Sequence, residues 1–470
     1  MSSSESNDKS AFTGLQPKTA GSKLVKSTSG TTASTSTQQS SNDVARNAAI
    51  SFDLGVLRND PSIQISATPE QLFSRHCGII GATGGGKSWT VAKLVEECAK
   101  HRSKVIIFDA TGEYHTLTHG VRHLYIGNDP EPTKGSMAVS VPYFHLRESD
   151  LATIFKPSGP SQAPKLRAAM RSLKLARLAP HLAVDGTIMK AHRNKVEFEE
   201  QSTIFNSDLD SPYALIEISN LVRQVQHECV DPFRSAVEPL IWGGVNAIEL
   251  SNCNSLVSRI ADIITLPQLA CIFNCGDLPS VFDEIHTFLK DPVSRVLRLS
   301  LKYLPFDYSA REIVVNALAR HLLELAREEV FRHLPLVVFI DEAHQFLNTE
   351  FEEELSKGAS INAMSLIAKE GRKYALTLAL ATQRPRDIPE NVLSQMGSLM
   401  VHRLINHYDL DVVEKAAGSM SRELMNTVPT LKSGECLLVG VDFDQPRLIK
   451  VKAPECPPSS RSADYQKLWK

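Results

Sequence analysis

Short continuous apolar runs alternate along the chain with stretches whose apolar residues recur at helical spacing. Such runs are typical of strands buried on both faces, as in a parallel sheet. The expected strands are CGIIG (77–81), SKVIIFDATGEY (103–114), SMAVSVPYFHL (136–146), LPLVVFIDEAH (334–344), ALTLALATQRP (375–385) and SLMVHRL (398–404). Helical spacing occurs at 88–101 and 311–330. Strands that alternate with helices predict an α/β fold, with a parallel sheet flanked by helices.

The segments outside this core pattern divide the chain. Residues 1–42 are rich in Ser, Thr, Gln and Gly, and we expect a disordered tail there because the stretch buries too little apolar surface to offset its ordering entropy. Two strand patterns, ISFDLGVL (50–57) and SIQIS (62–66), precede the core. The predicted parts are a tail (1–42), a short β segment (43–76), a first core part (77–149), a helical insertion (150–310), a second core part (311–455) and a C-terminal tail (456–470).

Composition narrows the class of protein. Apolar residues make up 42% and charged residues 22%, which fits a globular chain. The net charge of −2 excludes a protein coated in positive charge, so any nucleic acid would be held by a local lining. Cys271 and Cys275 have no second pair nearby, so reduced thiols are expected rather than a zinc site. With no signal pattern and no long apolar run, we expect a cytoplasmic protein without membrane contact.

A glycine-rich motif marks a phosphate site. GATGGGKS (81–88) fits G-x-x-x-x-G-K-[ST], follows an expected strand and opens an expected helix, which argues against a chance match. Glycines let backbone N–H groups close around phosphate oxygens, and the helix N-terminus adds positive potential. Lys87 is expected to reach the β- and γ-phosphates of ATP, and Ser88 to bind Mg²⁺. The predicted nucleotide contacts are Gly81, Ala82, Thr83, Gly84, Gly85, Gly86, Lys87, Ser88 and Trp89.

A second motif, VVFIDEAHQF (337–346), ends a buried run in two acids. Asp341 is expected to hold Mg²⁺ and Glu342 to polarise the attacking water, with solvated strand-end acids as the alternative. The letters D-E-A-H also occur in a class of RNA helicases, which need a Ser-Ala-Thr-like motif and a second ATPase domain. The chain has neither, since only about 125 residues follow His344. His344 is therefore interpreted as a structural or sensor residue.

Several stretches together resemble the HerA/FtsK group of hexameric ATPases, and HerA-type proteins in particular. They occur in the family's order and cover residues 50–145 and 310–455. The matching stretches are RHCGIIGATGGGKSWT (75–90), VIIFDATGEY (105–114), VVFIDEAHQFL (337–347), IAKEGRKYALTLALATQRPRDIPENVLSQMGSLMVHRL (367–404) and LKSGECLLVGVDFDQPRLIKV (431–451). The stretch 367–404 is the most specific, because a generic P-loop protein would not share it. The resemblance implies a RecA-like P-loop core that uses ATP and Mg²⁺.

The resemblance also implies further site residues. Asp109 and Glu113 match acids of a D-x-x-G-E-Y motif placed near the nucleotide. Gln383 matches the family's sensor glutamine at the end of the strand beside the acids, where it would report the γ-phosphate and orient water. A strand-end hydrogen bond is the alternative for Gln383.

One arginine is implied to act between subunits. Arg372, in E-G-R-K-Y, matches the arginine that the family offers to a neighbouring subunit's ATP. A guanidinium placed there stabilises transition-state charge and makes hydrolysis depend on assembly. A surface salt bridge is the alternative for Arg372, and Lys373 and Arg384 are alternative fingers.

The function implied by the resemblance is an ATP-hydrolysing ring motor. Such a motor, expected to be a hexamer, would translocate on double-stranded DNA with a nuclease or other effector partner, in DNA processing or anti-phage defence. A second hypothesis is a nucleotide-gated scaffold for an effector enzyme, whose ATPase activity ignores DNA. A conjugation or secretion ATPase is a third. HerA-type proteins usually carry a full β-barrel before the core, whereas residues 43–76 leave room for a reduced one.

Two basic stretches lie in the predicted insertion. KLRAAMRSLKLARL (165–178) places Arg167, Arg171 and Lys174 on one face at helical spacing, and MKAHRNK (189–195) is a second cluster. Each could follow a DNA phosphate backbone, but the solvated face of an amphipathic helix is the favoured interpretation. Any DNA contact is expected to be to phosphates and independent of sequence.

Overall fold

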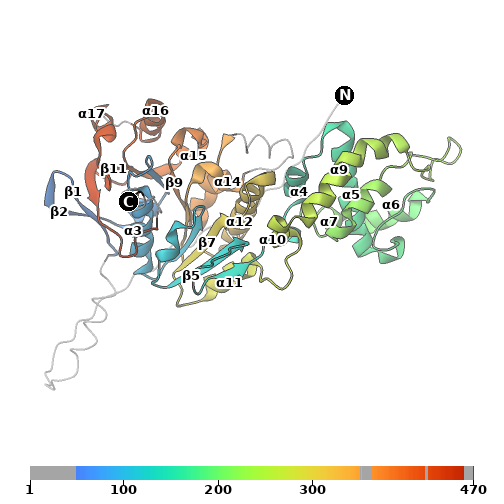
Figure 1. The fold of residues 1–470 in the computed structure, drawn as a ribbon, viewed down its shortest axis with the longest axis horizontal. Helices are drawn as coiled ribbons and strands as arrows, with labels where there is room; N and C mark the ends of the chain where they lie inside the picture. The colour runs from blue at the N-terminus through green and yellow to red at the C-terminus, as the bar shows by residue number, and fades with distance from the viewer. Residues whose placement is uncertain (1–48, 350, 352–361, 419–421, 460–468, 470) are drawn as a thin grey trace, which may run out of the picture. The chain divides into compact units, whose positions relative to one another are not determined.

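Twelve strands of the described chain form one sheet, shown as arrows in Figure 1. The computed structural model describes residues 49–349, 351, 362–418, 422–459 and 469, so the predicted disordered tail (1–42) lies outside the described residues. The strands are β1 (Phe52–Leu57), β2 (Asp60–Ala67), β3 (His76–Ile80), β4 (Lys104–Asp109), β5 (Val121–Gly127), β6 (Met137–Val139), β7 (Val296–Tyr303), β8 (Leu336–Ile340), β9 (Leu376–Thr382), β10 (Met396–Val401), β11 (Glu435–Gly440) and β12 (Arg447–Val451).

The strand order is β2-β1-β12-β11-β10-β3-β9-β8-β4-β7-β5-β6. From β10 to β6 all neighbours are parallel, which confirms the predicted α/β fold. Strands β3, β9 and β8 are consecutive neighbours in this parallel part. Their carboxyl ends therefore meet at one edge of the sheet, where the phosphate loop, Gln383 and the two acids leave the three strands.

Helices cover both faces of the sheet. Strand β4 shows the division, because Ile106 and Phe108 belong to one apolar core while Val105 and Ile107 belong to the other. Helix α3 packs on the second face, and α12 and α14 pack on the first. The longer helices are α3 (Lys87–Ala99), α4 (Glu148–Phe155), α5 (Gly159–Leu178), α6 (Lys195–Ile204), α8 (Leu221–His227), α9 (Ala247–Thr265), α11 (Val281–Lys290), α12 (Ala310–Arg327), α14 (Ala363–Glu370) and α16 (His407–Ala416). Shorter helices are α2 (Pro69–Phe73), α7 (Asn206–Leu209), α10 (Ala270–Phe273), α15 (Glu390–Leu393) and α17 (Arg422–Met425).

One end of the sheet is antiparallel, which the sequence pattern did not predict. The two strands predicted within 43–76 form a hairpin, β1–β2, and β1 pairs with β12. Strand β12 in turn pairs with β11, and β11 with β10. The first and last described strands thus lie side by side and extend the parallel part of the sheet. Alternation of apolar and polar residues does not report strand direction, so the sequence could not separate this end from the parallel part.

The predicted insertion (150–310) extends too far at its C-terminal end. Helices α4 to α11 form its helical part, but β7 returns to the sheet between β4 and β5. Its sequence VLRLSLKY carries Arg298 in the middle, and that side chain is buried at 3% exposure. A charged residue is almost never buried without a partner, so the burial of Arg298 requires one. Asp109 is the partner, since its Oδ2 lies 2.7 Å from Arg298 Nε.

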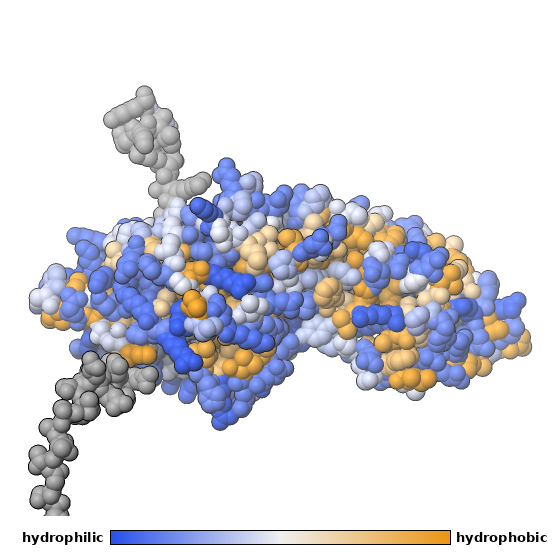
Figure 2. Space-filling view, turned by 90° about the horizontal axis from the view of Figure 1, so that it is seen from below, coloured by the Kyte–Doolittle hydropathy of each residue, from blue (hydrophilic) through white to orange (hydrophobic). Residues whose placement is uncertain are grey.

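The surface of the insertion carries large exposed apolar side chains. Figure 2 shows apolar patches toward the end of the molecule formed by the insertion. Exposed apolar residues of this part are Ile204, Phe233, Val237, Leu240, Val245 and Ile248. Among the described helices, none alone has the length and hydropathy of a membrane span. The consecutive helical segments Ala247–Thr265 and Pro267–Phe273 reach that length and hydropathy only together, and the chain bends by 67° between them.

Candidate nucleotide site

The phosphate loop connects β3 to α3 and depends on its glycines. Gly84 and Gly86 adopt positive φ angles of 74° and 112°, which glycine reaches without steric cost. A Cβ atom on Gly86 would lie 2.8 Å from the backbone nitrogen of Gly434, whereas one on Gly84 would meet nothing within 4 Å. The Gly434 N–H donates to the Gly85 carbonyl at 3.0 Å. The loop is therefore packed against Gly434 at Gly85 and Gly86, and there is open space beside Gly84 at its tip.

A buried histidine, which sequence reasoning missed, lies beneath this loop. A Cβ atom on Gly81 would lie 2.6 Å from Cβ of His402, so the loop backbone rests on that residue. His402 Nδ1 lies 2.9 Å from the Glu435 carbonyl oxygen, and Nε2 lies 2.9 Å from Thr90 Oγ1. Burial lowers the pKa of His402 to about 4, so the ring is neutral at pH 7. Nδ1–H then donates to the carbonyl, and Nε2 accepts from Thr90.

Lys87 is held between the two acids that follow β8. Its Nζ lies 2.9 Å from Asp341 Oδ1 and 2.9 Å from Glu342 Oε1, and all three side chains are buried. Burial alone would lower the pKa of Lys87, but the charges of Asp341 and Glu342 raise it above the usual value. Burial also raises the pKa of Asp341, against the attraction of Lys87. The ammonium group therefore stays charged in a site with an excess of negative charge.

Glu342 and the loop tip are connected through Gln383. Gln383 Nε2 donates to Glu342 Oε1 at 2.5 Å, and Thr83 Oγ1 donates to Gln383 Oε1 at 2.5 Å. Glu342 Oε2 is buried and lacks a hydrogen-bond partner among the described residues. His344 Nδ1 lies 3.4 Å from it, and burial lowers the pKa of His344. Oε1 is thus occupied by two donors, and Oε2 is the oxygen with a free lone pair.

Glu342 itself adopts a left-handed backbone conformation. Its φ and ψ angles are both 47°, a region in which a residue with a long side chain is strained. Strain of this kind persists where the surroundings fix a residue, and it is common at functional sites. Here the conformation turns the chain sharply after β8, so that Asp341 and Glu342 both reach Lys87.

The predicted acids Asp109 and Glu113 have different surroundings. Asp109 accepts hydrogen bonds from the backbone N–H groups of Gly112, Glu113 and Tyr114, and it pairs with Arg298. Its carboxylate is therefore occupied, and Asp109 positions the loop rather than contacting a ligand. The side chain of Glu113 is half-buried, and its pKa is raised by burial and by the charge of Asp341, against a hydrogen bond from Ser88. Glu113 thus lies beside the residues predicted to bind Mg²⁺.

The candidate fingers lie at opposite ends of β9. Arg372 and Lys373 lie in a 3-10 turn (Gly371–Tyr374) just before the strand, and both are exposed. Gln383 and Arg384 follow the strand, and Arg384 NH1 lies 3.7 Å from Asp387 Oδ2. The seven residues of β9 span about 20 Å at 3.3 Å per residue. Arg372 and Lys373 are therefore remote from the phosphate loop of their own chain, whereas Arg384 is beside it.

The basic stretches of the insertion form internal ion pairs. Lys174 is only 2% exposed and pairs with Glu148 at 2.5 Å, while Arg171 NH1 lies 3.0 Å from Asp210 Oδ1. In the second stretch, Lys190 pairs with the buried Glu228 at 2.6 Å. The favoured interpretation as a solvated face is therefore wrong for Lys174 and Lys190, whereas the Arg171 side chain is 42% exposed and fits that interpretation. Acidic partners more than 25 residues away in sequence, on other segments, explain the difference.

The chain is similar to known proteins over most of its length. Residues 52–231 match the family described as the central domain of helicase HerA. The chain is 24% identical to the DNA double-strand break repair helicase HerA of Sulfurisphaera tokodaii over 405 residues, covering 85% of this chain and 69% of the relative. It is 23% identical to a probable helicase of Methanocaldococcus jannaschii over 422 residues, covering 88% of this chain and 69% of the relative. The predicted resemblance is thereby confirmed.

Among solved structures, that of VirB4 of Thermoanaerobacter pseudethanolicus can be superposed on most of this chain. The TM-score is 0.48 at 15% identity, and the match covers 87% of this chain and 98% of that chain.

Proposed function

We propose that this chain, which is similar to HerA helicases, is a ring motor that uses ATP to move along double-stranded DNA. The observation that carries the proposal is the group formed by Lys87, Asp341, Glu342 and Gln383, which joins three neighbouring strands at one sheet edge. A phosphate loop without this group would suit nucleotide binding alone. The carboxylate of Glu342, with one oxygen free, suits hydrolysis.

The residues divide the chemistry among them. Lys87 would bind the β- and γ-phosphates of ATP, and Ser88 and Asp341 would hold Mg²⁺, which neutralises phosphate charge when bound. Glu342 would accept a proton from the attacking water on its free oxygen Oε2. Gln383 holds the other oxygen of Glu342 and is itself held by Thr83 of the phosphate loop. A shift of the loop tip on nucleotide binding would therefore reach Glu342 directly.

We propose that catalysis is completed between subunits of a homo-oligomer, a hexameric ring. The position of Arg372 supports this, because β9 separates that side chain from the phosphate loop of its own chain by about 20 Å. An arginine that cannot reach its own site is available to a neighbour's. Lys373 shares this position, while Arg384 lies at the edge that carries its own site.

We propose double-stranded DNA as the substrate track and a nuclease or other effector as the partner, in DNA processing or anti-phage defence. Two relatives are named DNA double-strand break repair helicases, which supports the DNA part of the proposal. Since Lys174 and Lys190 of the insertion are engaged in ion pairs, DNA contacts are expected outside those two stretches.

Steady-state ATP hydrolysis with and without long double-stranded DNA tests the proposal. We expect DNA to stimulate hydrolysis, and we expect Glu342→Gln to lower kcat by about 10²–10⁴-fold, as for loss of a general base, while nucleotide binding is retained. Activity that DNA leaves unchanged but a protein partner stimulates would contradict the motor and favour the scaffold hypothesis. Activity that Glu342→Gln leaves unchanged would contradict the assignment of the site.

A further inference from the structure

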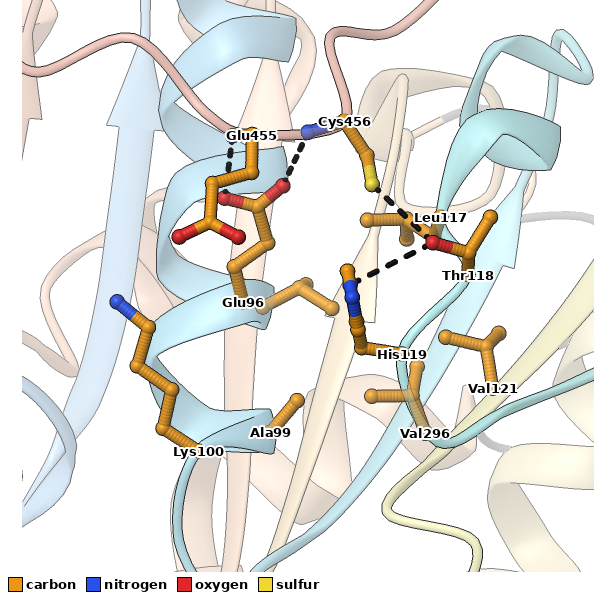
Figure 3. A pocket seen from close by; sticks show the side chains of 11 residues that line it. Glu96, Ala99, Lys100, Leu117, Thr118, His119, Val121, Val296, Glu455 and Cys456 are labelled. Carbon is orange, nitrogen blue, oxygen red and sulfur yellow. Dashed lines mark hydrogen bonds between the residues drawn. The ribbon is translucent and has the colours of Figure 1, made fainter.

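The chain after β12 crosses α3 as an extended strap, which we define as residues 452–459. The strap begins where the Lys452 N–H donates to the Leu54 carbonyl at 2.9 Å. It then passes over Glu96 of α3, as Figure 3 shows, and the carboxylate of Glu96 accepts two backbone hydrogen bonds. Oε2 lies 2.9 Å from the nitrogen of Glu455, and Oε1 lies 2.7 Å from the nitrogen of Cys456.

Because the strap is rich in proline, it has few backbone N–H groups with which it can be held on α3. Its sequence is KAPECPPS, so prolines occupy 454, 457 and 458. Proline has no N–H and fixes φ near −65°, which makes the strap stiff and leaves it few donors. From 454 to 458 the backbone has two N–H groups, those of Glu455 and Cys456, and both donate to Glu96. Hydrogen bonds to a carboxylate are about twice as strong as neutral ones.

Apolar packing beneath this part of the strap is incomplete. A cavity of about 190 Å³ lies between the strap, α3 and the segment before β5. Its apolar walls include Val95, Leu117, Val121 and Val296, as seen in part in Figure 3. Among the described residues, the Cys456 sulfur forms a hydrogen bond with Thr118 Oγ1 at 3.5 Å, and Cys456 packs at the margin of the apolar core on this face. The carboxylate of Glu96 therefore holds the middle of the strap, while Pro454 and Pro458 are buried on either side.

The end of the strap reaches the nucleotide site. The next donor after the prolines is the N–H of Ser459, and it donates to the backbone carbonyl of Glu113 at 2.9 Å. Glu113 belongs to the loop that Asp109 holds by three backbone N–H groups, and its side chain lies beside Ser88 and Asp341. The loop is thus fixed from below by Asp109 and from outside by the strap.

We propose that Glu96 is a positioning residue that anchors the strap and thereby holds Glu113 in place at the nucleotide site. Its link to catalysis rests on the proposed function, whereas the anchoring does not. Among the described residues, no hydrogen bond or ion pair joins the Glu96 carboxylate to the phosphate loop, and Glu96 acts through two backbone N–H groups and a stiff proline segment. The strap can transmit position because Pro457 and Pro458, which lie between the anchored Cys456 and Ser459, restrict the backbone there.

Two variants interrupt the anchor from either side, each with a matched control in the full chain. Glu96→Ala removes the acceptor, and Glu455→Gln changes an exposed carboxylate on the same strap without removing an N–H group. Cys456→Pro removes one donor, and Cys456→Ala removes the same thiol but keeps the N–H. Hydrogen exchange of the peptides that cover 110–116 and 452–459 is measured in all four, together with kcat and KM for ATP at saturating Mg²⁺.

We expect Glu96→Ala and Cys456→Pro to speed exchange in both peptides by about tenfold, and to raise KM several-fold while kcat changes by less than twofold. The two controls should match the wild type, and the double variant Glu96→Ala/Cys456→Pro should be no worse than Glu96→Ala alone, because both remove the same contact. Unchanged exchange at 110–116 in Glu96→Ala would overturn the proposal. Absence of any hydrolysis by the wild type would instead contradict the proposed function, and the exchange comparison would still test the anchor.

Discussion

Thr83 connects the phosphate loop to Glu342 through a single glutamine. We predict that Thr83→Val lowers kcat about fivefold, because Gln383 loses the donor that fixes its amide, a bond worth about 1 kcal/mol. KM for ATP should change little, since the loop backbone is held separately by Gly434. Steady-state kinetics measures both constants. Thr83→Ser keeps the hydroxyl and is the control; an equal loss of kcat in both variants would contradict this role.

His402 makes stability depend on pH. Its folded pKa is about 4, below the usual 6.5, so the stability it contributes is present above pH 6.5 and is lost as pH falls toward 4. We predict that the free energy of unfolding falls by about 3 kcal/mol more between pH 7 and pH 4 in the wild type than in His402→Gln. Denaturant unfolding at several pH values measures the difference. Parallel curves for both proteins would show that His402 does not remain neutral.

At the scale of single residues, most of the candidate site could be predicted from sequence motifs. The contacts that could not be predicted involve partners far away in the chain. Lys87, Asp341 and Glu342 were predicted from local motifs and Gln383 from the family resemblance, and the structure brings the four together. Asp109 was predicted beside the nucleotide, but its carboxylate is occupied by Arg298, which lies 189 residues later in the chain. No local pattern announces such a pairing, and the same holds for His402 beneath the loop. Sequence motifs therefore identified the residues of the candidate site better than they identified the residues that support this site from distant parts of the chain.

Helix α5 contains a basic stretch that could have indicated DNA binding, but one of its lysines, Lys174, is buried in an ion pair within the fold. We predict that Lys174→Met lowers the free energy of unfolding by about 2 kcal/mol, because its buried ammonium pairs with Glu148 and donates to the Ser211 carbonyl. The salt dependence of DNA binding should stay unchanged. Arg167→Ala, which alters an exposed residue of the same helix, is the control and should change stability by less than about 0.5 kcal/mol.

Several strands show what cannot be predicted from the spacing of apolar residues along the sequence. Strand β7 lies within the stretch predicted as a helical insertion (150–310), and it is a central strand of the sheet. Strands β1 and β2 were expected from their patterns, whereas β11 and β12 were not predicted as strands, and neither was the antiparallel order at this end of the sheet. A pattern of apolar positions reports which face is buried. It carries no information about which strand is adjacent or in which direction it runs.

The proposed ring allows a complementation experiment between two inactive chains. Arg372→Ala keeps an intact site, and Glu342→Gln keeps an intact arginine. We predict that each alone loses about 10³-fold in hydrolysis and that mixing them restores a substantial part, because a site of the first chain meets the arginine of the second. ATP hydrolysis as a function of mixing ratio is the measurement. No restoration at any ratio would show that Arg372 acts within its own chain or not at all; the same series with Arg384→Ala distinguishes the alternative finger.

The pairing of β1 with β12 also has a consequence for synthesis. Gly55 lies opposite Val451 in this ladder, so the ribosome makes one strand nearly 400 residues before the other. At about 5–20 residues per second, the nascent hairpin waits tens of seconds with an unpaired edge. Open strand edges invite pairing with other chains. We therefore expect the growing polypeptide to need chaperone protection until its last strands emerge, and premature termination to leave a product that aggregates.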